Sequence, residues 1–189
     1  MQDLVNTANE LGASIETFIN EAAEVRSGIL TWLANHERIP EDSLASILQL
    51  RIMLQTVDGN DRKLTQAYNL VADQTAFKMS GLKQTAEQLN YGPIAEGGWK
   101  IAVGTISRRG FPHYLDEISR HVSMLDGKLR DADEAIKNWN TNKVGDRAAG
   151  ADVRLALDGV SLQAQALQGF VQTGMMIIIS AADGQKADA

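Results

Sequence analysis

Apolar residues recur at every third or fourth position along most of this chain, with polar and charged residues between them. The pattern is most regular from Leu115 to Trp139, where the spacing is 3-4-3-4-3-4-3. This heptad spacing predicts a helix that buries one face against other helices. The residues of this seam are Leu115, Ile118, Val122, Leu125, Leu129, Ala132, Ile136 and Trp139.

Two further stretches have the same spacing. Between residues 2 and 36 the seam is Leu4, Ala8, Leu11, Ile15, Phe18, Ala22, Val25, Ile29 and Trp32. Near the C-terminus it is Val153, Leu157, Val160, Ala164, Leu167, Val171, Gly174 and Ile178. Val5, Ile19 and Leu33 widen the first seam, which favours a helix packed among several others over a two-stranded coiled coil. The apolar segment 169–182 predicts a helix end that is buried on nearly all sides, or else a segment that binds a membrane or partner.

The region 41–90 allows two interpretations. Pro40-Glu41-Asp42 is a favourable first helical turn, and apolar residues continue to Val57. Residues 58–61 (Asp-Gly-Asn-Asp) then have turn composition, although the heptad phase continues beyond them. Either 61–90 is a separate helix, or 41–90 is one rod kinked at the glycine. We prefer two helices.

Residues 91–112 have no helical period. Five glycines and two prolines fall in this insert, and the β-branched residues near 98–107 predict a short strand or hairpin. A connection of this length inside a compact bundle is often functional. Cations lie beside aromatic residues here, a composition that suits a protein partner or an anionic lipid surface. The candidate contact residues are Trp99, Lys100, Arg108, Arg109, Phe111 and Tyr114. The alternative is a connector that folds back and caps the bundle.

These patterns together predict an all-α fold. We expect an elongated up-and-down bundle of four or five antiparallel helices, with the glycine-rich, hairpin-prone insert at 91–112. Residues 1–182 form a single domain in this interpretation, and residues 183–189 form a frayed polar tail.

Composition narrows the functional classes. The 189 residues include no cysteine, so disulfides, thiolate metal sites and a cysteine nucleophile are absent. The net charge of −6 argues against nucleic-acid binding, which needs a basic face. The start of the chain lacks the features of a secretory signal, so we expect a cytoplasmic protein, although a leaderless secreted protein would look the same.

One constellation could bind a metal. His113, Glu117 and His121 are spaced i, i+4 and i+8, so their side chains could share one helix face and bind a transition metal. The alternative is a solvated polar face at the start of an amphipathic helix. No motif for a nucleophile or a phosphate loop is present. We therefore expect a protein that is not an enzyme and has no cofactor.

Three functions fit these observations. The first is a non-enzymatic assembly protein that binds a protein partner or itself through a helical face and residues 91–114. The second is a membrane-active protein: a long helical hairpin with a glycine-rich insert resembles, in architecture, the helical pore-forming toxins, whose insert enters the membrane. The third is a ligand- or metal-binding bundle that uses the histidine face.

Overall fold

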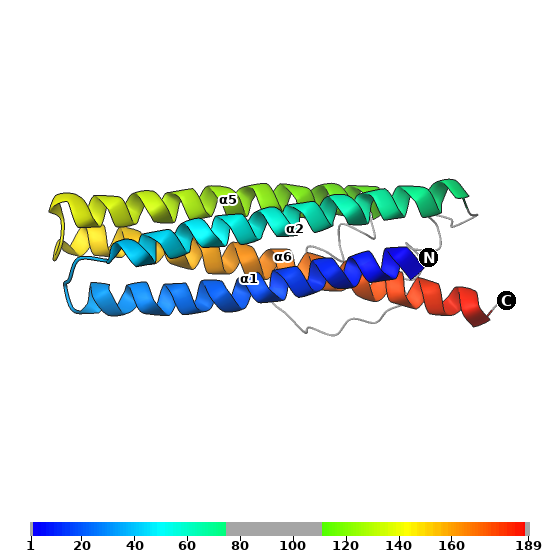
Figure 1. Ribbon diagram of the computed structural model, residues 1–189, viewed down its shortest axis with the longest axis horizontal. Coiled ribbons are helices and arrows are strands. Elements are labelled where there is room, and N and C mark those ends of the chain that lie inside the picture. The colour runs from blue at the N-terminus through cyan, green and yellow to red at the C-terminus, as the bar shows by residue number, and fades with distance from the viewer. Residues whose placement is uncertain (1, 75–110, 188–189) are drawn as a thin grey trace.

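The computed structural model describes residues 2–74 and 111–187 and shows four long helices in an elongated bundle (Figure 1). They are α1 (Gln2–Ala34), α2 (Glu41–Gln74), α5 (Phe111–Asn142) and α6 (Arg147–Ala187). Consecutive helices run in opposite directions, as predicted for an up-and-down bundle. No strand occurs within the described ranges, and most of the insert predicted at 91–112 lies outside them.

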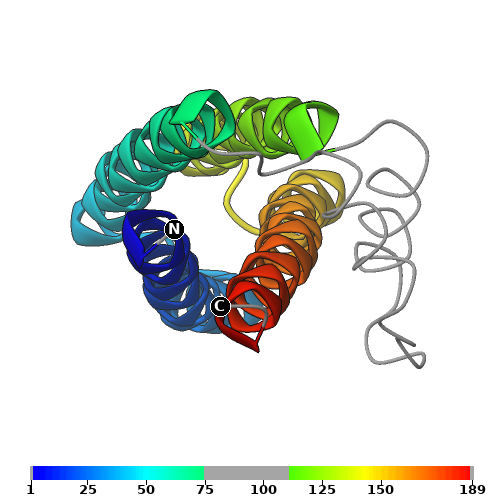
Figure 2. The ribbon, with the colours of Figure 1, turned by 90° about the vertical axis from the view of Figure 1, so that its right-hand side faces the viewer.

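The four helices form a ring in which each one packs against two neighbours (Figure 2). The packed pairs are α1 with α2, α2 with α5, α5 with α6, and α6 with α1. The core lies along the axis of this ring. Every residue of the 115–139 seam is buried, and so is every residue of the seam between 153 and 178. In α1 the seam ends differently from the prediction: Leu33 is buried, whereas Trp32 is 36% exposed.

The prediction of a turn at 58–61 is wrong, because α2 is one continuous helix from Glu41 to Gln74. Gly59 disfavours a helix by only about 1 kcal/mol, whereas the buried seam of α2 continues on both sides of it. This seam consists of Ile47, Leu50, Leu54, Val57, Asp61, Leu64 and Tyr68. Tertiary packing therefore outweighs the local turn signal.

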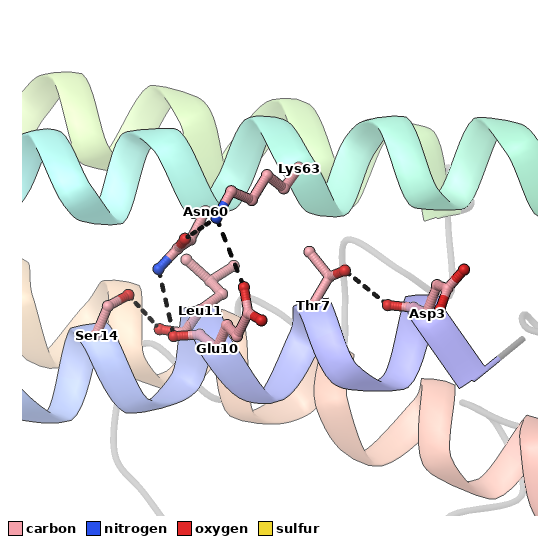
Figure 3. Close-up of polar contacts among 7 residues, drawn as sticks. All are labelled: Asp3, Thr7, Glu10, Leu11, Ser14, Asn60 and Lys63. Carbon is pink, nitrogen blue, oxygen red and sulfur yellow. Dashed lines mark hydrogen bonds and ion pairs between the residues drawn. The ribbon is translucent and has the colours of Figure 1, made fainter.

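Polar contacts fix this part of α2 against α1 (Figure 3). The Asn60 side-chain amide donates to the Glu10 carbonyl at 3.5 Å, and the Lys63 ammonium lies 3.7 Å from the Glu10 carboxylate. Within α2, Arg62 pairs with Asp58 one turn earlier at 2.7 Å. Asn60, one of the residues predicted to form a turn, therefore connects α2 to α1.

The two short connections lie at the end of the bundle away from the termini (Figure 1). In the first connection, the Ile39 amide donates to the Asn140 side-chain oxygen at 2.9 Å, and the Asn140 amide donates to the Ile39 carbonyl at 2.8 Å. In the second, the Asp146 carboxylate accepts the Ala149 N–H at 2.8 Å and caps α6.

The prediction of a frayed tail also differs from the structure. Helix α6 continues to Ala187, so residues 183–187 are helical and only 188–189 of the expected tail lie outside the described residues. The expectation relied on polarity, but Gln185, Lys186 and Ala187 are all good helix formers.

Candidate interaction surface

Most of the basic and aromatic residues predicted as a contact surface lie outside the described part of the chain. These are Trp99, Lys100, Arg108 and Arg109. Phe111 begins α5, but its side chain is not among those described. Tyr114 corrects the prediction, because it is fully buried and its hydroxyl accepts the Gly174 N–H at 3.0 Å. Tyr114 therefore fixes α5 to α6 inside the bundle and offers no exposed contact surface.

Two residues of the predicted metal-binding face, Glu117 and His121, lie in different surroundings. The His113 side chain is outside the described set, and Glu117 pairs with Arg120, whose Nε lies 3.1 Å from the Glu117 Oε2. His121 is buried between α5 and α6, where its Nδ1 lies 2.6 Å from the Gln163 amide nitrogen. Among the described side chains, which do not include His113, no three His, Asp or Glu residues converge on a metal site.

Burial determines the charge state of His121. Loss of solvation lowers the pKa of the imidazole, and the nearby Arg120 lowers it further, whereas Glu117 raises it. With Gln163 as the donor, Nδ1 accepts and the ring proton sits on Nε2, which has no hydrogen-bond partner among the described residues. A buried, neutral imidazole of this kind packs against Phe170 at 4.7 Å between ring centroids and contributes to the core.

A buried acid in α2 is absent from the sequence-based expectations. Asp61 is 2% exposed and its Oδ1 has no hydrogen-bond partner among the described residues. Burial, with smaller contributions from Asp58 and Asp116, raises the pKa of Asp61 to about 7 despite the nearby Arg62. The signal was present in the sequence, since Asp61 occupies the seam position between Val57 and Leu64.

The outer side of α6 has a second apolar stripe, opposite its buried seam. Leu155 is 73% exposed and Leu162 is 67% exposed, the two highest values among the exposed large hydrophobic residues. Small residues continue the stripe at spacings of 3-4-4-3-4. We call this surface the outer seam; it consists of Ala148, Ala151, Leu155, Gly159, Leu162 and Ala166. It ends there because Gly169, the next residue in phase, is buried.

The residues of the outer seam carry no charge, and the side chain of Lys128 from α5 lies beside Gly159. One acid beside the seam, Asp158, accepts two hydrogen bonds from Arg26 of α1, with the Arg26 Nη2 at 2.6 Å. Between α1 and α6, Ala23, Gln165 and Leu162 help to line a groove of about 500 Å³. The surface therefore combines two exposed leucines with an adjoining groove of side-chain size. The sequence analysis did not identify it, because only the buried seam between Val153 and Ile178 was traced along this helix.

No helix of the described residues is both long and apolar enough to cross a membrane. No protein-family model, curated protein or solved structure matches this chain. Any functional proposal therefore rests on the geometry itself.

Proposed function

We propose that this protein is a non-enzymatic assembly protein that binds a second copy of itself through the outer seam of α6. The observation that supports this most strongly is the exposure of Leu155 and Leu162 on a helix that already buries its other apolar face. Large exposed apolar surfaces with no charge are typical of protein–protein contacts. Residues 91–111, without the buried Tyr114, stay in the proposal as a second contact surface on the basis of their composition alone.

The order of residues along the outer seam favours a second copy over an unrelated partner. Leu155 and Leu162 lie at equal distances from the midpoint between residues 158 and 159, and so do Ala151 and Ala166. An antiparallel contact between two α6 helices, with a two-fold axis at this midpoint, places each leucine opposite a leucine and Ala151 opposite Ala166. A two-fold contact requires such a self-complementary surface. At the centre, the Lys128 side chain of α5 lies beside Gly159 and would have to move as the two helices approach.

The arrangement predicts a weak dimer. In this contact Leu155 of one copy lies opposite Leu162 of the other, beside the groove at Ala23 and Gln165. Burying one leucine contributes roughly 1.5–3 kcal/mol, so four leucines contribute an amount comparable to the entropy lost on association. Because the two terms nearly cancel, we expect weak association that depends on protein concentration.

Size exclusion with light scattering across a concentration series tests this proposal. The parent mass should rise from 20.5 kDa towards twice that value as concentration increases. The double variant Leu155→Glu, Leu162→Glu should remain at the monomer mass, because charge is buried at the contact. Leu48→Glu with Ile52→Glu on α2 is the matched control, since these residues are 50% and 55% exposed and lie away from the outer seam. A parent that is monomeric throughout, or a control that dissociates equally, would contradict the proposal.

Disulfide trapping tests the antiparallel orientation in a chain that has no cysteine of its own. A single cysteine in place of Gly159 should cross-link two copies, because the contact brings this position close to its own symmetry mate. A single cysteine in place of Ala151 should not, whereas a mixture of Ala151→Cys and Ala166→Cys chains should form the mixed dimer. Efficient self-linking through position 151 would indicate a parallel contact and overturn the two-fold arrangement.

A further inference from the structure

The core of the bundle differs between its two ends. Among the described residues, the buried polar and charged side chains are Asp61, His121 and Thr173, and all three lie in the half that bears the termini (Figure 1). The described core of the other half consists of hydrophobic residues. Asp61 is the only acid of this group, and its Oδ1 has no hydrogen-bond partner among the described residues.

The register of α2 against α5 determines what Asp61 faces. Arg51 of α2 pairs with Asp126 of α5, with 3.0 Å between the Arg51 Nε and the Asp126 Oδ1. The two helices are antiparallel, so ten residues further along α2 and ten residues back along α5 the corresponding positions are Asp61 and Asp116. Asp116 is exposed on α5, and its carboxylate contributes to raising the pKa of Asp61. One level of this contact therefore has an ion pair, and the other has two acids.

The cations of α2 next to Asp61 already have acidic partners. Arg62 pairs with Asp58 at 2.7 Å, one turn away in the same helix. Towards α1, the Lys63 ammonium lies 3.7 Å from the Glu10 carboxylate. Burial raises the pKa of Asp61, and so does the carboxylate of Asp58, whereas Arg62 lowers it only in part.

The titratable groups of α5 near this level add no compensating charge. Glu117 and Arg120 neutralise each other, with the Arg120 Nε 3.1 Å from the Glu117 Oε2. His121 is buried, and this burial lowers the pKa of its imidazole, which favours the neutral ring. The charge that remains is that of Asp116, which repels an ionised Asp61.

The contact between α2 and α5 is the least extensive of the four helix pairs in the ring. The short connections that join α1 to α2 and α5 to α6 both lie at the opposite end (Figure 1). An unpaired carboxylate inside the core is strongly unfavourable. Separation of α2 from α5 at the end that bears the termini would bring it into water while breaking the fewest contacts.

We propose that Asp61 is a pH-sensitive switch that controls the contact between α2 and α5. With its proton, the half of the bundle that bears the termini stays closed. Without the proton, this half opens between α2 and α5, while the Arg51–Asp126 ion pair keeps the other half together. The switch does not depend on self-association through the outer seam.

Amide hydrogen exchange followed by NMR at pH 5 and pH 8 tests the proposal, after correction for the intrinsic pH dependence of exchange. The opening equilibrium should rise by up to about a hundredfold between these values, because the pKa of Asp61 is about 7 when buried and 3.8 when solvated. The rise should be confined to amides near Leu64, Tyr68 and Ile118, with those near Leu50 as the internal control. An equal rise in both regions would indicate global unfolding and overturn the local switch. The absence of any rise would overturn it entirely.

Charge variants identify the group responsible. Asp61→Asn should abolish the rise, because asparagine is neutral at both pH values. Asp152→Asn removes an exposed acid from α6 and is the matched control, which should retain the rise. Asp116→Arg places a cation opposite Asp61, as Arg51 lies opposite Asp126, and should reduce the rise to less than about tenfold. A full rise in Asp61→Asn or in Asp116→Arg, or its loss in the control, would refute the proposal.

Discussion

At the scale of single residues, Asp61 is an acidic side chain in an apolar environment. It occupies a core position of α2, and its Oδ1 has no hydrogen-bond partner among the described residues. An ionised carboxylate in such a place is strongly unfavourable, which is why burial raises its pKa to about 7. The neutral acid is therefore the form compatible with the packed bundle.

The pH dependence of stability follows from this shift. The folded protein holds a proton on Asp61 that the unfolded chain releases at its ordinary pKa of 3.8. The free energy of unfolding that depends on Asp61 therefore decreases as pH rises from about 4 to about 7, by at most about 4 kcal/mol. Above that range this contribution is constant. Asp61→Asn should remove this decrease, so urea unfolding at pH 5 and pH 8 should differ less than in the parent. An equal pH dependence in both proteins would show that Asp61 does not ionise as described.

At the scale of single helices, α2 shows where prediction from sequence succeeds and where it does not. The heptad seams identified the helices, because their apolar spacing reports directly on the buried face. The turn at 58–61 was predicted from a local signal, and the long-range packing of α2 against α1 and α5 overrides it. Packing at this level cannot be read from the four residues themselves.

Glycines inside the helices provide a matched pair of tests. A β-carbon at position 59 would meet no other atom within 4 Å, so Gly59→Ala should raise the free energy of unfolding by about 0.5–1 kcal/mol. Gly174 lies against the ring and hydroxyl of Tyr114, so Gly174→Ala should destabilise the protein by about 1–3 kcal/mol or more. Urea unfolding of both variants at one pH measures these changes. Stabilisation by both substitutions would mean that Tyr114 does not pack on Gly174.

At the scale of the whole molecule, the ring of four helices decides which apolar faces remain exposed. The sequence predicted the buried seams of α5 and α6 position by position. It did not predict the outer seam, because Leu155 and Leu162 differ from buried leucines only in which neighbours surround α6.

The paired hydrogen bonds between Ile39 and Asn140 have a consequence for hydrogen exchange. They join residues 101 positions apart and hold the first connection to the last turn of α5. The Ile39 amide should therefore exchange with solvent as slowly as core amides, although it lies outside any helix. Asn140→Ala should speed its exchange selectively, which amide exchange followed by NMR would detect. Fast exchange of the Ile39 amide in the parent would contradict this prediction. Slow exchange would mean that the bundle begins to open from the other end, which bears its termini.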